Sequence, residues 1–255
     1  MRQSLSLSAL PGLPNVEPGD DLAALIGAGL DRLGETLQAG DILVLAQKIV
    51  SKAENRYAYL NGVEPSARAL QLAVQADKDP RIVELILRES VEVLRVRKGA
   101  IIVEHRNGYV HAHAGIDQSN IESQSDNPRV LLLPENPDAS AAALRSELMQ
   151  RYGVEIAVII NDSAGRAWRN GVIGFALGCA GLVALENRIG TRDLFGRALE
   201  ITEIAVADEL AAAASFLMGQ AAEGAPVVLI RGAAVTAAET GSGALIRAAE
   251  QDLFR

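Results

Sequence analysis

Short apolar runs alternate with amphipathic segments along most of the chain, and this alternation limits the fold more than any other feature. Runs at 42–46, 130–133, 154–160 and 226–230 have the length and composition of buried strands. Apolar runs at 100–103 and 109–114 flank Asn107 and Gly108, a dipeptide typical of a tight antiparallel hairpin. A hairpin argues against a purely parallel sheet, so we predict an α+β fold with mixed sheets and packed helices.

Helix signals fill most of the intervals between these runs. They comprise capping residues at the start, apolar residues three or four apart, and glycines at the end. The predicted helices cover 22–33, ending at Gly34; 80–88, begun by Asp79 and Pro80; a segment capped by Asp138 and closed by Gly153; 202–218, followed by Gly219; and a closing helix at 242–254.

Composition excludes several classes of protein. The 255 residues suggest a single unit, 1–255, and leave open a division into two interleaved α+β subdomains. Lys plus Arg number 24 and Asp plus Glu 32, a net charge of −8, which argues against a nucleic-acid partner. No apolar run approaches the roughly 20 residues of a membrane span, and residues 1–10 lack the apolar core of a signal peptide. We expect a cytoplasmic protein without a membrane partner.

The single cysteine, Cys179, excludes an intrachain disulfide. It lies in the small apolar run 178–181. We interpret it as a packed small hydrophobe rather than a nucleophile.

The first polar cluster follows the apolar run at 42–46. Gln47 comes next, and then Lys48, Lys52 and Arg56, which a helix would align because they lie four residues apart. Such a stripe can hold phosphate groups. A solvated helix face explains the same spacing, and the sequence leaves both interpretations open.

The second cluster, 114–120, offers Asp117 and Asn120 after a predicted strand. Hard cations such as Mg²⁺ or Mn²⁺ take oxygen ligands of this kind, although an Asx turn is an equally good interpretation. Upstream, His111 and His113 would share one strand face. Such a pair can bind zinc, but no third ligand is evident, and we favour a half-exposed strand face.

The third cluster, 161–171, is the densest polar block and directly follows the most apolar run. Asp162 and Ser163 suit a metal there, Arg166 and Arg169 could pair with anionic ligand groups, and Trp168 could line the pocket. An ordinary polar turn with an Arg–Asp ion pair is the alternative. The fourth cluster, 218–226, by itself indicates only a loop between a helix and a strand.

At these clusters the sequence resembles the coenzyme F420-0:gamma-glutamyl ligase family, in the form without the nitroreductase-like domain that some members carry. The resemblance rests on six stretches in family order that cover the chain nearly end to end. They are GLPNVEPGDDL (12–22), GDILVLAQKIVSKAENR (40–56), AGIDQSN (114–120), LLPENPDASAAALR (132–145), NDSAGRAWRNG (161–171) and EITEIAVADELAAAASFLMGQ (200–220).

The resemblance implies an activity and a set of partners. A GTP-dependent ligase would join L-glutamate, through its α-amine, to the carboxylate of the coenzyme precursor F420-0, and a further glutamate can follow through a γ-linkage. The expected intermediate is an acyl phosphate, with GDP and phosphate released. Mg²⁺ or Mn²⁺ is required, and K⁺ can assist. The implied fold is an α+β arrangement that forms an intertwined homodimer.

The resemblance also assigns roles to residues. Asp117, Asp162, Ser163 and Gln220 would be metal ligands, and Asp117, Asp162, Arg166 and Arg169 form our catalytic set. Contacts with GTP would come from the loop around 218–226 and from individual residues, namely Leu13, Pro14, Asn15, Val16, Gln47, Lys52, Asn120, Met218, Gly219 and Gln220. Two other hypotheses stay open: an amide ligase of the same fold acting on another acid or amino acid, and a nucleotide-binding module without turnover.

Overall fold

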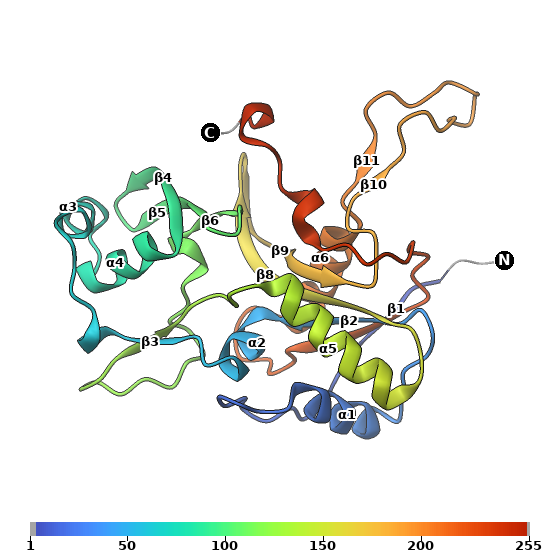
Figure 1. Ribbon diagram of the computed structural model, residues 1–255, viewed down its shortest axis with the longest axis horizontal. Coiled ribbons are helices and arrows are strands. Elements are labelled where there is room, and N and C mark those ends of the chain that lie inside the picture. The colour runs from blue at the N-terminus through green and yellow to red at the C-terminus, as the bar shows by residue number, and fades with distance from the viewer. Residues whose placement is uncertain (1–3, 254–255) are drawn as a thin grey trace.

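The computed structural model describes residues 4–253 and confirms a mixed α+β fold (Figure 1). Its largest sheet has the order β1-β12-β2-β8-β9. β2 and β8 pair in parallel, and the other neighbours are antiparallel. The strands are β1 (Ser6–Ala9), β12 (Val227–Arg231), β2 (Ile42–Ala46), β8 (Ala157–Arg166) and β9 (Arg169–Ala180).

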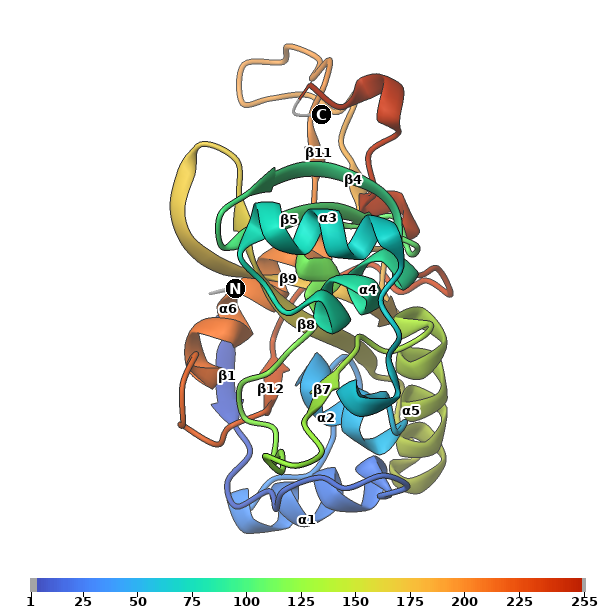
Figure 2. The same ribbon diagram turned by 90° about the vertical axis from the view of Figure 1, so that its left-hand side faces the viewer.

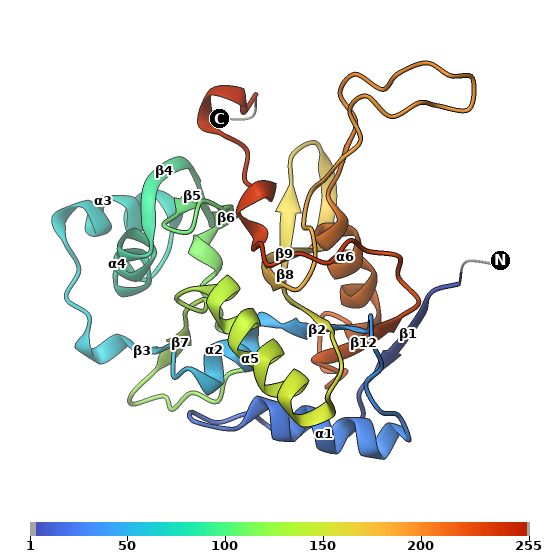
Figure 3. The same cartoon turned by 45° about the vertical axis from the view of Figure 1, so that its right-hand side comes forward.

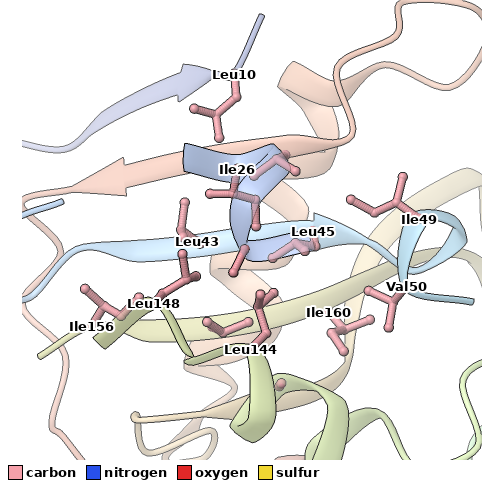
Figure 4. Packing of buried hydrophobic residues seen from close by; sticks show 14 of the residues in the cluster. Leu10, Ile26, Leu43, Leu45, Ile49, Val50, Leu144, Leu148, Ile156 and Ile160 are labelled. Atoms are coloured by element: carbon pink, nitrogen blue, oxygen red, sulfur yellow. The ribbon is translucent and has the colours of Figure 1, made fainter. Parts of the chain in front are cut away.

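Helices cover both faces of this sheet, which explains why its central strands are apolar without alternation. α1 (Leu22–Leu33) and α5 (Pro137–Tyr152) enclose one core, and α6 (Val206–Met218) encloses the other. Figure 2 shows α5 and α6 on opposite sides of the strands. In Figure 4, Ile26 of α1 and Leu148 of α5 meet Leu43 of β2 in the first core.

A second lobe with its own core lies beside the main sheet (Figures 1 and 3). Its helices pack on a three-stranded antiparallel sheet, β4-β5-β6. A short ribbon, β3 paired with β7, joins the lobe to the rest of the fold. The elements are β3 (Tyr57–Tyr59), α3 (Ala67–Ala76), α4 (Pro80–Arg88), β4 (Ser90–Arg97), β5 (Ala100–His105), β6 (Val110–Ala112) and β7 (Arg129–Leu131).

An arm projects from the main sheet between β9 and α6, drawn in orange at the upper right of Figures 1 and 3. β10 (Glu186–Asn187) and β11 (Glu203–Ile204) pair at its base. Beyond this pair the chain is almost entirely exposed, including Leu194 and Phe195, which are 98% and 96% exposed. No signal that we recognised in the sequence predicts this arm.

Local signals predicted several elements correctly. α1 ends as expected at Gly34, whose φ of 75° is the left-handed conformation that glycine adopts most easily. The expected hairpin joins β5 to β6 through Asn107 and Gly108. Cys179 is 1% exposed in β9, which confirms its interpretation as a packed small side chain.

Two predicted starts are wrong. α5 is capped by Asn136, whose side chain accepts from the Ala139 amide, because Pro137 occupies the first helical position. Asp138 instead accepts from the amides of Cys179 and Ser242. α6 begins at Val206 rather than 202, because the preceding residues belong to β11 and its exit from the arm.

The polar block after the apolar run at 154–160 is not a turn, because β8 continues to Arg166. β8 and β9 form a long antiparallel hairpin, and pairing with β9 satisfies the backbone of the polar residues. Gly174 of β9 allows this hairpin to approach α6, because a Cβ at that position would collide with the Cβ of Ser215.

The predicted closing helix at 242–254 is also wrong. The segment forms two short 3-10 turns, η3 (Ser242–Leu245) and η4 (Ala249–Gln251), and its last predicted position lies outside the described residues. Most side chains after Ser242 are partly or fully exposed, so no buried face stabilises a longer helix. Among residues 4–253, no helix has both the length and the apolarity needed to cross a bilayer.

Candidate active site

Three chain segments meet at one edge of the main sheet because of how its central strands pair. β2 and β8 are parallel, so their carboxyl ends lie side by side, and Ala46 pairs with Asn161. β12 runs antiparallel to β2 and therefore starts at this same edge. The Ala46 amide donates to the Pro226 carbonyl at 2.8 Å. The polar residues that follow β2, continue β8 and precede β12 are thus brought together.

A pocket of about 390 Å³ opens at this edge. Every residue that we expected to bind the nucleotide lines it. Three of the four expected metal ligands line it as well, namely Asp162, Ser163 and Gln220. The remaining lining residues include Lys48, Asn161 and Ser215.

Asp117 lies just beyond the lining and is fixed from two sides by α2 (Gln47–Ala53). Nε2 of Gln47 donates to Oδ2 of Asp117 at 2.5 Å, and Nζ of Lys48 lies 3.1 Å from Oδ1. The Gln47 amide is itself oriented, because its Oε1 accepts from the Ser51 hydroxyl at 2.9 Å. The backbone of Asp117 pairs with Leu131 through two hydrogen bonds. The carboxylate is therefore held by side chain and main chain together.

The electrostatics of Asp117 are unusual for a carboxylate. Its pKa is raised to about 6, chiefly by burial and also by the nearby Asp162, while Lys48 and Gln47 act in the opposite direction. Two carboxylates that raise each other's energy in a partly buried site are stabilised by a cation.

Asp162 has a contact that spacing along the sequence does not predict. Nε2 of His111, from β6 of the second lobe, lies 3.2 Å from Oδ2 of Asp162. Burial lowers the pKa of His111, but the hydrogen bond and charge of Asp162 outweigh it, so the net shift is upward. Next to Asp162, Asn161 is 5% exposed, and its Oδ1 has no hydrogen-bond partner among residues 4–253.

The loop between α6 and β12 closes the pocket from the other side. Nε2 of Gln220 donates to the hydroxyl of Ser215 at 3.0 Å, which leaves the amide oxygen of Gln220 available. Nδ2 of Asn120 donates to the carbonyl of Ala221 at 2.9 Å and ties the second and fourth clusters together. Four polar clusters that are distant in sequence therefore surround one pocket.

The predicted cationic stripe is only partly present. α2 ends at Ala53, and Asn55 has a left-handed backbone with φ of 54°, so Arg56 leaves the helix face. Arg56 instead donates from Nε to the Leu133 carbonyl and pairs with Glu89. Lys52 stays in the pocket, and its ammonium makes no hydrogen bond or ion pair with the described residues. Burial lowers the pKa of Lys52.

Other expectations are not met within this chain. Arg166 and Arg169 lie at the exposed tip of the β8–β9 hairpin and do not line the pocket. Trp168 is 87% exposed at the same tip, so the expectation that it lines the pocket is wrong. His111 and His113 do not share a strand face, because β6 ends at Ala112 and His113 has φ of 56°. His111 is also buried rather than half-exposed.

The donor set at this edge fits a hard divalent cation. Asp117 and Asp162 supply carboxylates, Ser163 and Gln220 supply neutral oxygens, and the unpartnered Oδ1 of Asn161 is a further buried acceptor. Residues 4–253 hold no cluster of three His, Cys, Asp or Glu side chains suited to a metal. A cation here would need the neutral oxygens and oxygens of a bound ligand.

Sequence reasoning missed three contributors to the site. Lys48 was recognised only as part of a stripe, His111 only as half of a histidine pair, and Ser215 not at all. Lys48 and His111 contact residues from distant parts of the chain, and Ser215 contacts Gln220 beyond the end of α6. Spacing along the sequence carries no signal for such contacts.

Comparison with known proteins finds relatives of this chain over nearly its whole length. Residues 12–232 match the model of the family described as F420-0:Gamma-glutamyl ligase. Three curated relatives, each named coenzyme F420:L-glutamate ligase, are similar over nearly the full chain. The protein of Methanothermobacter thermautotrophicus is 47% identical, covering 98% of this chain and 99% of its own. Those of Methanopyrus kandleri and Archaeoglobus fulgidus are 44% and 41% identical, covering 99% and 96% of this chain and 98% and 94% of their own.

The fold and the pocket thus belong to an enzyme of the ligase class. The chain is a member of the F420-0:gamma-glutamyl ligase family.

Proposed function

We propose that this protein is a GTP-dependent ligase that joins the α-amine of L-glutamate to the carboxylate of F420-0. The two substrates, the coenzyme and L-glutamate, are inferred from the names of the relatives. The observation that supports GTP as the co-substrate is that all ten residues expected to bind the nucleotide line one pocket. The volume of this pocket, about 390 Å³, lies in the usual range for small-molecule sites.

The pocket has a charge distribution suited to a nucleoside triphosphate. Lys48 and Lys52 of α2 are cationic residues of its lining. Leu13, Val16 and Pro226 add apolar lining suited to a base or a ribose. Since the ammonium of Lys52 has no protein partner among residues 4–253, it is available to a phosphate.

Asp117, Asp162, Ser163 and Gln220 would hold Mg²⁺ or Mn²⁺, which would neutralise charge on the β- and γ-phosphates. The chain prepares this arrangement before any ligand binds. Gln47 and Lys48 hold Asp117. The Ser215 hydroxyl accepts a hydrogen bond from Nε2 of Gln220, so the amide oxygen of Gln220 stays available to a cation.

The chemistry requires activation of a carboxylate, because a carboxylate is a poor electrophile. Phosphoryl transfer from GTP to one carboxylate oxygen forms an acyl phosphate, and the amine of glutamate then displaces phosphate. No protein nucleophile is needed. Cys179 could not act as one, since it is buried and burial raises its pKa to about 12.

A homodimer is part of this proposal. Leu194, Phe195 and Ile201 are at least 88% exposed on an arm that extends away from its own fold (Figure 3). Apolar side chains presented in this way are typical of an interface between subunits. Light scattering of the purified protein should give twice the mass of one chain.

Incubation of the protein with GTP, Mn²⁺, L-glutamate and F420-0, followed by mass spectrometry, tests this function. A gain of one or more glutamyl units that depends on GTP supports it. GTP binding with no glutamyl product would contradict it. That result would leave a ligase for another acid or amino acid, or a nucleotide-binding module without turnover. Parallel incubations with other amino acids and with other carboxylic acids separate these two alternatives.

A further inference from the structure

His111 connects the second lobe to the main sheet at the point where Asp162 lies. It comes from β6, and Asp162 comes from β8. The imidazole is 9% exposed and packs against the ring of Phe175, with the ring centroids 5.7 Å apart. A polar ring in such a position has little freedom to turn. Its two nitrogens therefore have defined partners.

The partner of Nδ1 fixes the hydrogen on the ring. Nδ1 lies 2.9 Å from the carbonyl oxygen of Ala112, and a carbonyl oxygen only accepts, so Nδ1 carries a hydrogen and donates it. Nε2 is left facing Oδ2 of Asp162 at 3.2 Å. A nitrogen lone pair and an anionic oxygen at this distance require a proton or a metal cation between them. This is also the usual arrangement of a metal-binding histidine, whose other nitrogen donates to a carbonyl or carboxylate.

The separation of these two atoms matches the geometry of a shared cation. An octahedral ion with bonds of about 2.0–2.1 Å places neighbouring ligands about 2.9 Å apart. The observed 3.2 Å between Nε2 of His111 and Oδ2 of Asp162 is close to that spacing.

We propose that Nε2 of His111 is a ligand of the divalent cation that Asp162 binds, and that it makes the site prefer Mn²⁺ to Mg²⁺. Mg²⁺ favours oxygen ligands and gives up its water reluctantly, whereas imidazole is a better ligand for transition-metal ions. The inference rests on the proposed function only in placing a cation at Asp162.

Pulsed electron paramagnetic resonance of Mn²⁺ bound to the wild-type protein with GTP is the first test. Protein labelled with ¹⁵N-histidine is compared with unlabelled protein, so that histidine nitrogens are distinguished from amide nitrogens. We expect a coupling typical of directly bound imidazole that changes with the label. Bound Mn²⁺ without this coupling, or no bound Mn²⁺, would overturn the inference.

Variants then show which of the three histidines is responsible. His111→Gln should abolish the coupling and weaken Mn²⁺ binding about tenfold or more, with a smaller effect on Mg²⁺. His113→Asn is the matched control. It lies two residues away, has a backbone conformation that Asn tolerates, and should keep the coupling. Retention of the coupling in His111→Gln would contradict the assignment.

The outcome is separable from that of the proposed function. Coupling to histidine in a protein that ligates no glutamate would support this inference and overturn the proposed function. Glutamate ligation by a protein whose bound Mn²⁺ has no histidine coupling would do the reverse.

Discussion

Lys48 and Asp117 form an ion pair, with Nζ of Lys48 3.1 Å from Oδ1 of Asp117, and this pair links the first turn of α2 to the loop after β6. Both side chains are about three-quarters buried. Even so, the ion pair does not offset the burial of Asp117, whose pKa is raised to about 6. The ionised carboxylate is therefore held at a cost to stability, which is typical of functional sites.

Asp117→Asn should stabilise the metal-free protein while reducing its ligase activity. The folded-state pKa of Asp117 is about 6 and exceeds the unfolded value of about 3.9, so the folded protein binds this proton more tightly than the unfolded chain does. The stability that the proton contributes is present below about pH 4 and is lost as pH rises through about 6. Asparagine resembles the protonated form at every pH. At pH 8 the free energy of unfolding should rise by about 1–3 kcal/mol, and the gain should vanish near pH 4.

Urea unfolding in the presence of a chelator, at pH 4 and pH 8, measures this effect. Asp77→Asn is the control, because Asp77 is exposed and has a left-handed backbone that Asn tolerates. Destabilisation by Asp117→Asn at pH 8 would show that the ionised carboxylate contributes net stability, which is the opposite of what its raised pKa predicts.

Local signals in the sequence predicted those elements whose boundaries depend on neighbouring residues. Gly34 ends α1 and the Asn107–Gly108 pair turns the β5–β6 hairpin, because a left-handed backbone or a tight turn restricts which residues fit. The extension of β8 through Asp162 was missed. Its polar residues are strand only because β9 pairs with them, and that pairing is a tertiary contact.

The candidate site was predictable to a similar degree. The resemblance selected residues that line one pocket, and the parallel pairing of β2 with β8 explains why they converge. The contacts of Lys48 with Asp117 and of His111 with Asp162 were not predictable from spacing, because each joins two different parts of the fold.

Asp162→Asn should lose metal binding and turnover without losing the fold. The substitution removes one negative charge from a hard-cation site and keeps the volume of the side chain. Activity should fall about 100-fold or more, since even the outer partners of metal ligands contribute about 10–100-fold. Calorimetric titration with Mn²⁺ in the presence of GTP gives the affinity, and circular dichroism checks the fold. An unchanged affinity and a normal rate would remove Asp162 from the metal site.

Lys52→Ala should raise the Michaelis constant for GTP about tenfold, which corresponds to about 1.4 kcal/mol of binding. Lys52 lines the pocket, its ammonium makes no hydrogen bond or ion pair with the described residues, and burial lowers its pKa, so a bound phosphate would supply the contact that the ammonium lacks. Stability should change by no more than about 0.5 kcal/mol, as for a residue without a structural partner. Steady-state kinetics measure the constant, with the exposed Lys98→Ala as the matched control. An unaltered dependence on GTP would identify Lys52 as part of a solvated helix face.

Glu89→Gln should destabilise the protein at neutral pH, by about 3 kcal/mol. The Glu89 carboxylate is 9% exposed and lies 3.0 Å from Arg56 and 3.2 Å from Arg106. Burial alone would raise its pKa, but His105 and the two arginines together hold the pKa below its usual range. The stability it contributes is therefore present above about pH 4.3 and lost as pH falls through the lower, folded-state pKa.

Urea unfolding at pH 7 and pH 3 checks both the size and the sign of this contribution. The difference between wild type and Glu89→Gln should be large at pH 7 and much smaller at pH 3. The exposed Glu147→Gln on α5 is the control and should change neither value. Equal stabilities of wild type and Glu89→Gln at pH 7 would show that the ion pairs of Glu89 contribute no net stability.

Transfer of a labelled oxygen tests most directly whether GTP phosphorylates the carboxylate of the acceptor, the step on which the proposed function depends. The carboxylate of F420-0 is labelled with oxygen-18, and the reaction is run with GTP, L-glutamate and Mn²⁺. Amide formation must expel one carboxylate oxygen, and a phosphoryl group makes that oxygen a good leaving group. We predict one labelled oxygen in inorganic phosphate for each molecule of F420-0 that gains its first glutamate. Label in GMP, with release of pyrophosphate, would contradict this mechanism, because the carboxylate would then have attacked the α-phosphate.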